Sequence, residues 1–132
     1  MSEALIRRYY AAFNAGDWPG MLDCVTEDVA HDINQGPREI GRAAFADFLA
    51  RMERCYRERA DDLVVMVSAD GLRAAAEFII HGSYLVADEG LPPAHGQGYV
   101  LPVGAFFAIR EARIARVTNT YNLTDWLRQV GL

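Results

Sequence analysis

His31 is the residue in this chain best placed by its type and spacing to move a proton. Val29, His31 and Ile33 alternate with more polar neighbours, which predicts a strand over Val29–Ile33 with His31 on its apolar face. A neutral imidazole that faces a pocket can accept or release a proton near neutral pH. A core histidine satisfied by one hydrogen bond would leave the same pattern, so both interpretations stand.

Asp32 follows directly and is the second catalytic candidate. On a regular strand its carboxylate points to the face opposite His31. A bulge before the turn at residues 34–36 would bring it inward. The alternative is a structural carboxylate paired with Arg38 or Arg42.

A third group of residues is aromatic or polar and suits the lining of a pocket. The expected ligand-binding residues are Phe13, Trp18, Asn34, Met52, Tyr56, Tyr84, Tyr99, Asn119 and Tyr121. Alternation places Tyr84, Tyr99 and Tyr121 on one face of the predicted sheet. An aromatic-lined space with a few hydroxyls suits a flat hydrophobic ligand that carries one or two oxygens, although aromatic side chains can equally fill a core.

Several other kinds of site are not indicated. The net charge is −5, which disfavours a nucleic-acid surface. The three histidines are scattered, and Cys24 and Cys55 are far apart, so no metal ligand set is expected. Neither a glycine-rich phosphate loop nor a G-x-S-x-G motif is present, so no cofactor is predicted. No membrane span or signal peptide is recognised, and a cytoplasmic location is expected.

The hydrophobic pattern predicts one α+β domain over residues 1–132. Its helices are expected at residues 3–15, just after Asp17, at 41–56 and at 123–130, and its strands at 29–33, 63–68, 72–86, 99–110 and 113–121. In the helix at 41–56 the solvent side is assigned to Arg42, Asp47, Arg51, Glu53 and Arg54. Long strands joined by hairpins form a curved antiparallel sheet, and three N-terminal helices close it into a cone.

The order of these elements carries a resemblance to a known superfamily. Arg8-Tyr9 precedes Gly16-Asp17, followed by Glu27-Asp28-Val29 and by Gly41-Arg42 at the start of a helix. This combination resembles the nuclear transport factor 2-like superfamily, and more narrowly its SnoaL-like and ketosteroid-isomerase-related members. The stretch at residues 31–36 is similar to a signature of one isomerase-related subgroup. The resemblance implies a cone with a pocket inside and a dimer through the outer face of the sheet.

Ketosteroid isomerase itself uses a carboxylate base, a tyrosine and a protonated aspartic acid. The resemblance places its tyrosine at Tyr9, its base at Ile33 and its protonated acid near Ala105. Because only the tyrosine is kept, true ketosteroid isomerase activity is not expected.

Two functions of different classes follow. The first is an enzyme that binds a small hydrophobic carbonyl compound and moves a proton next to the carbonyl, giving isomerisation, cyclisation or dehydration. His31, with Asp32, would be the acid–base group, Tyr9 or Tyr121 would bind the oxyanion and Asn119 would orient the ligand. The second is a non-catalytic binding or accessory module. An epoxide-opening hydrolase ranks last, because it needs two carboxylates and an arginine and the sequence offers only Asp32.

A homodimer is expected from the outer face of the sheet. Alternation exposes one apolar patch there, formed by Ile79, Leu85, Val100 and Phe106. A patch of this kind on a small domain usually marks an interface.

Overall fold

The computed structural model describes residues 1–131, and its helices begin and end at recognisable signals. Helix α1 (Ser2–Ala15) ends at Gly16, whose φ of 67° is the left-handed conformation that glycine adopts without strain. Helix α2 (Trp18–Asp23) begins at Asp17, whose carboxylate accepts the N–H of Gly20. Helix α3 (Arg42–Cys55) and helix α4 (Leu123–Val130) follow, and Asn122 caps α4.

Six strands form a single sheet in the order β2-β1-β6-β5-β4-β3. They are β1 (Val25–Asp32), β2 (Arg38–Ile40), β3 (Tyr56–Val67), β4 (Arg73–Tyr84), β5 (Gln97–Arg110) and β6 (Arg113–Tyr121). The α+β class and the curved sheet are as predicted, but the sheet is mixed because β1 runs parallel to β6. The sequence contains no local signal for that pairing, since it joins the first strand of the chain to the last.

Strand β3 begins seven residues before the expected start at Leu63, directly after α3. Its first half carries several charged side chains on the outward face, so the alternation of apolar and polar residues could not be recognised there. The ladder with β4 shifts register between Asp61 and Val64, where Asp62 has a φ of 57°. This bulge helps the long strand to bend, as bulges do.

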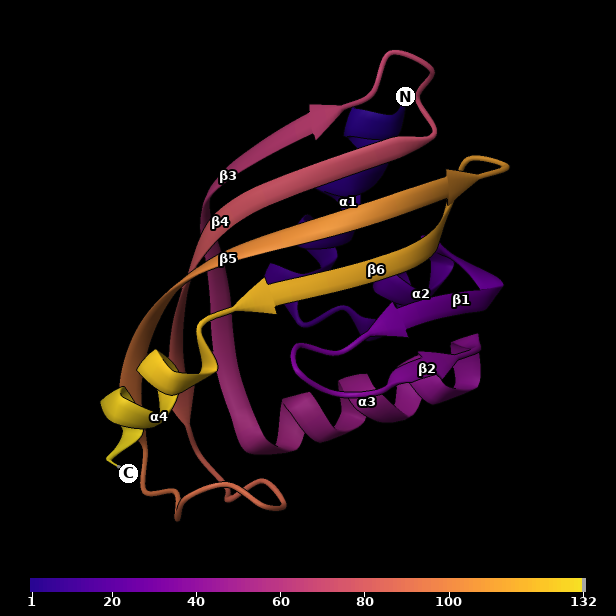
Figure 1. The fold of residues 1–132 in the computed structure, drawn as a ribbon. Coiled ribbons are helices and arrows are strands. Elements are labelled where there is room, and N and C mark those ends of the chain that lie inside the picture. The colour runs from indigo at the N-terminus through magenta and orange to yellow at the C-terminus, as the bar shows by residue number, and fades with distance from the viewer. Residues whose placement is uncertain (132) are drawn as a thin grey trace.

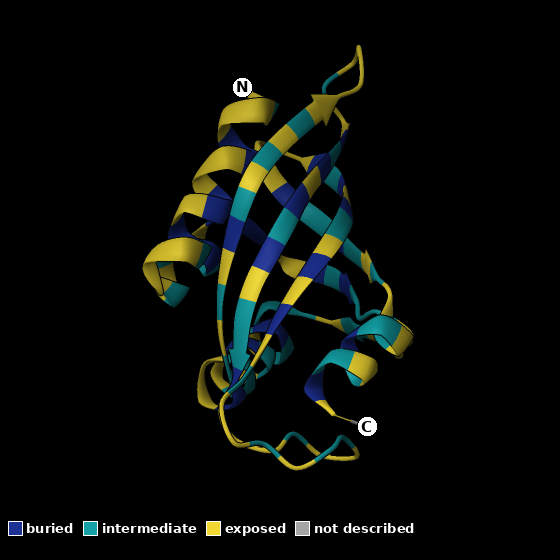
Figure 2. Ribbon diagram, turned by 90° about the vertical axis from the view of Figure 1, so that its left-hand side faces the viewer, coloured by how far each residue is buried: buried dark blue, intermediate teal, exposed yellow. Residues whose placement is uncertain are grey.

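The sheet curves around the helices and leaves an open cone (Figure 1). Helices α1 and α3 cover its concave side, and α4 lies with the β4–β5 loop at the end where the long strands bend. Buried residues alternate with more exposed ones along β4 and β5 (Figure 2). Because successive side chains of a strand point to opposite faces, the buried ones lie on the concave side. No helix within residues 1–131 is long and apolar enough to cross a membrane.

Candidate functional site

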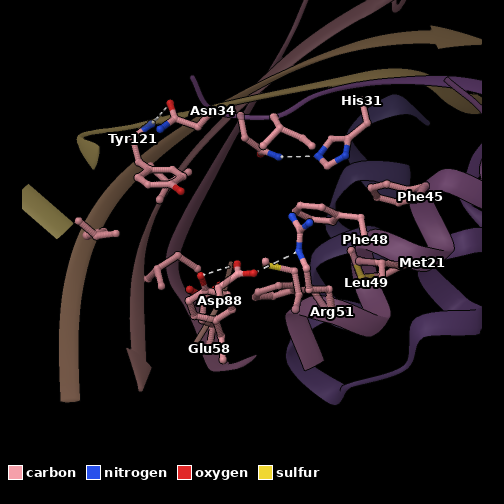
Figure 3. Close-up of a pocket in the computed structure, with 18 of the residues that line it drawn as sticks. Met21, His31, Asn34, Phe45, Phe48, Leu49, Arg51, Glu58, Asp88 and Tyr121 are labelled. Atoms are coloured by element: carbon pink, nitrogen blue, oxygen red, sulfur yellow. Dashed lines mark hydrogen bonds and ion pairs between the residues drawn. The ribbon is translucent and has the colours of Figure 1, made fainter. Parts of the chain in front are cut away.

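The concave face of the sheet and the four helices enclose a cavity of about 440 Å³ (Figure 3). Its wall is mainly aromatic and aliphatic, with a few polar groups, which is typical of a small-molecule site. The expected site residues that line it are Tyr9, Phe13, Trp18, His31, Asn34, Met52, Tyr56, Asn119 and Tyr121. Most of the predicted site residues therefore line the cavity, although the sequence could not show how much space the side chains leave.

His31 points from β1 into the cavity and is only 1% exposed. Its ring lies between two phenylalanines of α3, with centroid distances of 5.0 Å to Phe45 and 4.4 Å to Phe48. Nε2 lies 3.4 Å from Nδ2 of Asn119 on β6, and Nδ1 has no hydrogen-bond partner within residues 1–131. The side chain is thus held by packing and by one long polar contact.

This environment keeps the imidazole of His31 uncharged. Burial lowers the pKa of His31 to about 4; the charge of Arg51 lowers it further, and that of Asp32 opposes the shift. At neutral pH one ring nitrogen therefore carries a lone pair. A neutral histidine in an apolar wall can accept a proton from a ligand pressed against it.

Asn34 and Tyr121 lie next to each other in the cavity wall and supply further polar atoms (Figure 3). The Asn34 side chain accepts the backbone N–H of Tyr121 through Oδ1 at 3.1 Å. Its Nδ2 is buried without a partner in the described chain. Burial raises the pKa of Tyr121, so its hydroxyl stays protonated. Both groups can donate hydrogen bonds to a ligand oxygen.

A second polar group lies across the cavity from His31, and two of its members, Asp88 and Arg51, were missed from the sequence (Figure 3). Asp88, from the β4–β5 loop, accepts the hydroxyl of Tyr56 at 2.8 Å and lies 3.6 Å from Nε of Arg51. Arg51 was assigned to the solvent side of α3. Its side chain is indeed 43% exposed, but its guanidinium also turns over the ring of Phe48, 5.5 Å from the centroid, and reaches the cavity wall.

Glu58 on β3 is the third missed residue. It lines the cavity, and its Oε2 accepts the hydroxyl of Tyr99 at 2.5 Å. Burial raises the pKa of Glu58, and the hydrogen bond from Tyr99 partly opposes this. The alternation of Tyr56, Glu58 and Ala60 was the available signal, but charged neighbours obscured it.

Tyr84 and Tyr99 do not line the cavity, contrary to the expectation. Tyr84 is fully buried behind Tyr56 and Trp126, and its hydroxyl donates to the carbonyl of Pro92 at 2.6 Å. Tyr99 lies behind Glu58 and presents its hydroxyl to that carboxyl. Alternation identified the face of the sheet correctly, but not which side chains lie nearest the empty space.

Asp32 lies outside the cavity, on the outer face of the sheet. Its carboxylate accepts Nε and Nη2 of Arg38 at 2.6 and 3.0 Å, and the hydroxyl of Thr118 at 2.6 Å. The hydrogen bond from Arg38 is the main reason that its pKa falls to about 2. The strand is regular at this point, so Asp32 cannot share a ligand atom with His31. Asp32 is instead a structural carboxylate paired with Arg38, which was the alternative interpretation of the sequence.

Within residues 1–131 no group of three or more His, Cys, Asp or Glu side chains is placed to hold a metal ion. Cys24 and Cys55 are both buried free thiols.

Comparisons with known proteins place this geometry among relatives. Residues 6–117 match the SnoaL-like domain family. A candidate polyketide cyclase from Pseudomonas putida KT2440 is 62% identical, over 99% of this chain and 98% of its own, with a TM-score of 0.98. A second, from Xanthomonas campestris, is 58% identical over 98% and 96% of the two chains, with a TM-score of 0.95. No functionally curated protein matches the chain.

More distant structures share the fold alone. A phenazine biosynthesis-related protein from Pseudomonas aeruginosa is 17% identical over 99% of this chain and 85% of its own, with a TM-score of 0.81. Because one fold supports many reactions, such neighbours do not identify the chemistry.

Proposed function

The chain belongs to the SnoaL-like domain family, and from that premise we propose that it binds a small hydrophobic carbonyl compound and catalyses proton transfer next to the carbonyl with its own side chains. The candidate polyketide cyclases at 62% and 58% identity favour ring closure over isomerisation or dehydration. In such a reaction a base removes a proton from the carbon beside one carbonyl. The resulting carbanion attacks a second carbonyl of the same molecule, and the alkoxide formed takes up a proton.

The observation that carries this proposal is an uncharged, buried histidine in the wall of an apolar cavity. His31 would be the base, and its long contact with Asn119, 3.4 Å between nitrogens, would yield to a ligand. With a pKa of about 4 it is a weak base in the empty cavity. The negative charge that develops on the ligand would pair with the imidazolium and raise that pKa during the reaction.

The developing oxyanion needs hydrogen-bond donors that are in place before the reaction. The unpartnered Nδ2 of Asn34 and the hydroxyl of Tyr121 are two such groups in the cavity wall. The hydroxyl of Tyr9 is a third candidate from α1, since burial raises its pKa and keeps it protonated.

The test is hydrogen exchange at carbon, which needs no knowledge of the natural substrate. β-Tetralone in heavy water, followed by NMR, should lose its protons beside the carbonyl faster with the protein than in buffer. His31→Gln should reduce the protein-dependent rate by about 10²–10⁴-fold, the usual contribution of a general base. His81→Gln is the matched control, because His81 lies on the exposed outer face. A His31→Gln variant that folds and retains the full rate would exclude His31 as the base.

A non-catalytic binding module is the second candidate. The close packing of His31 between Phe45 and Phe48, and its low pKa, favour a structural histidine. Under this function β-tetralone would bind, but its exchange would remain at the buffer rate.

Epoxide opening still ranks last among the candidate functions, but the structure gives a different reason from the sequence. Two carboxylates and an arginine do meet at the cavity, namely Glu58, Asp88 and Arg51. However, Asp88 is already occupied by Tyr56 and Arg51, and Glu58 by Tyr99. Because both carboxyl groups already have hydrogen-bond or ion-pair partners, they are less able to activate a water molecule.

We further propose a homodimer through the outer face of the sheet. Val100, Phe106 and Leu85 are 48%, 49% and 37% exposed there, while Ile79 is half-buried. Phe106→Glu should convert a dimer into a monomer in sedimentation at micromolar concentration. A wild-type protein that is already monomeric would contradict the proposal.

A further inference from the structure

Glu58, Gly82 and Tyr99 lie side by side on three neighbouring strands. Glu58 of β3 pairs with Gly82 of β4, which in turn pairs with Tyr99 of β5. A Cβ atom at Gly82 would overlap the Tyr99 ring. The missing side chain therefore lets the ring lie across β4, so that its hydroxyl reaches Glu58 on the far strand.

This arrangement leaves one oxygen of Glu58 for a ligand. Oε2 accepts the hydroxyl of Tyr99, and Oε1 has no hydrogen-bond partner within residues 1–131. Glu58 lines the cavity, so this free oxygen belongs to a group at the cavity wall. A carboxyl that is already held in place loses little freedom when it binds a ligand.

No basic side chain neutralises Glu58 in the described chain. Arg51, the arginine that lines the cavity, is 3.6 Å from Asp88, and the neighbours of Glu58 on β3, Arg57 and Arg59, are exposed on the other face. An unpaired carboxylate in an apolar wall is costly, which favours the uncharged acid. The direction of the pKa shift, upward because of burial, agrees with this argument.

We propose that Glu58 is the residue that recognises a second oxygen of the ligand, by donating a hydrogen bond from its free carboxyl oxygen to a ketone. Tyr99 is the positioning residue. The ligand is then a neutral, flat keto compound with one oxygen toward His31 and Asn34 and another toward Glu58. A carboxylate at the second position is rejected, because it would meet the acidic pair Glu58 and Asp88 without a free cation. This inference rests on the proposed function, since it needs the cavity to bind a ligand.

The groups that face Glu58 come from several elements and set its protonation. They are Tyr56 on the same strand, Tyr99 on β5, Tyr121 on β6, Asp88 in the β4–β5 loop and Arg51 on α3. The tyrosines are uncharged at neutral pH because burial raises the pKa of each. Arg51 and Asp88 form their own ion pair, so neither supplies Glu58 with a counter-charge.

The experiment uses three probes of one shape that differ at a single substituent. Acetylnaphthalene carries a ketone, ethylnaphthalene carries no oxygen and naphthoate carries a carboxylate. The wild-type protein should bind acetylnaphthalene roughly three- to tenfold more tightly than ethylnaphthalene, as one hydrogen bond allows. Naphthoate should bind more weakly than either at neutral pH. If neither acetylnaphthalene nor ethylnaphthalene binds, the cavity is not a site for such ligands and the proposed function fails with it.

Two substitutions then separate recognition by Glu58 from simple burial. Glu58→Gln keeps a hydrogen-bond donor and should retain the preference for the ketone, whereas Glu58→Leu should abolish it while still binding ethylnaphthalene. Glu77→Gln is the matched control, because Glu77 is exposed on the neighbouring strand. Equal binding of the ketone and the hydrocarbon by the wild type would overturn the role of Glu58 and leave the cavity intact as a site.

The infrared carbonyl band of labelled acetylnaphthalene reports which end of the cavity holds the ketone. A hydrogen bond shifts the band to lower frequency. The shift should appear in the wild type and in Glu58→Gln and disappear in Glu58→Leu. Its persistence in Glu58→Leu would mean that the ketone lies at the His31 end, and the inference would be wrong.

Discussion

The two ends of the cavity hold titratable groups of opposite type, and burial moves both toward the same state. At one end burial lowers the pKa of His31 to about 4, and at the other it raises the pKa of Glu58. Both groups are thereby pushed toward their uncharged forms. An uncharged histidine can accept a hydrogen bond or proton, and an uncharged carboxylic acid can donate one. One apolar environment thus prepares a base at one end and an acid at the other.

The largest expected effect of this difference is on how the free energy of unfolding depends on pH. The pKa of His31 falls from 6.5 to about 4 on folding, so the unfolded chain binds a proton more readily than the folded one. The shift adds about 3 kcal/mol to the free energy of unfolding above pH 6.5. This stabilisation is lost as the pH falls toward 4. Urea unfolding of the wild type and of His31→Gln should show that this slope vanishes in the variant.

Glu58 should produce a slope of opposite sign. Its pKa is raised on folding, so the folded chain holds a proton that the unfolded chain releases above pH 4.5. Its contribution to stability is present at low pH and is lost as the pH rises. The wild type should therefore lose stability as the pH rises above 4.5, and Glu58→Gln should remove that loss. Parallel slopes in wild type and both cavity variants would mean that neither group is held uncharged.

A smaller effect is expected at Gly82, which supports only the Glu58 end. Gly82→Ala would force the Tyr99 ring off β4, break its hydrogen bond to Glu58 and lower the free energy of unfolding by about 2 kcal/mol. Gly98→Ala is the matched control, because a Cβ there meets only a carbonyl oxygen at an ordinary 3.8 Å. The exchange of β-tetralone, which depends on the His31 end, should survive in folded Gly82→Ala. A variant that matches Gly98→Ala in stability would show that the Tyr99 ring has another place to lie.

The smallest effect belongs to Asp32, which neighbours His31 in sequence but not in space. Its side chain is 25% exposed and its partner Arg38 is 53% exposed, so Asp32→Asn should cost about 1 kcal/mol or less. The β-tetralone exchange rate should not change. A large loss of exchange in a stable Asp32→Asn variant would return Asp32 to the catalytic group.

The sequence was most informative where the signals are local. The helices capped by Asp17 and Asn122 begin where they were expected, and the period of two located β4, β5 and β6 closely. Alternation on a single strand was sufficient to place His31 inside the cone. These features depend on residues only a few positions apart.

The rest depended on contacts between distant segments. The parallel pairing of β1 with β6 leaves no local trace. Glu58 was missed because the charged outward residues of its strand resemble those of a loop. Arg51 was missed because its long side chain bends back over Phe48. Tyr84 and Tyr99 lie on the correct face, but only the packed structure shows that other side chains separate them from the empty space.

The parallel pairing of β1 with β6 also bears on how the protein folds. Asn119 and His31 are 88 positions apart, and β1 has no partner on one side until β6 has been synthesised. Contacts of such long range slow folding, and an unpaired strand edge exposed meanwhile invites aggregation. During synthesis the N-terminal half would wait for the last strand, so the His31 end of the cavity would be among the final parts to form. A chain truncated before β6 should therefore lack this end of the cavity and be prone to aggregate.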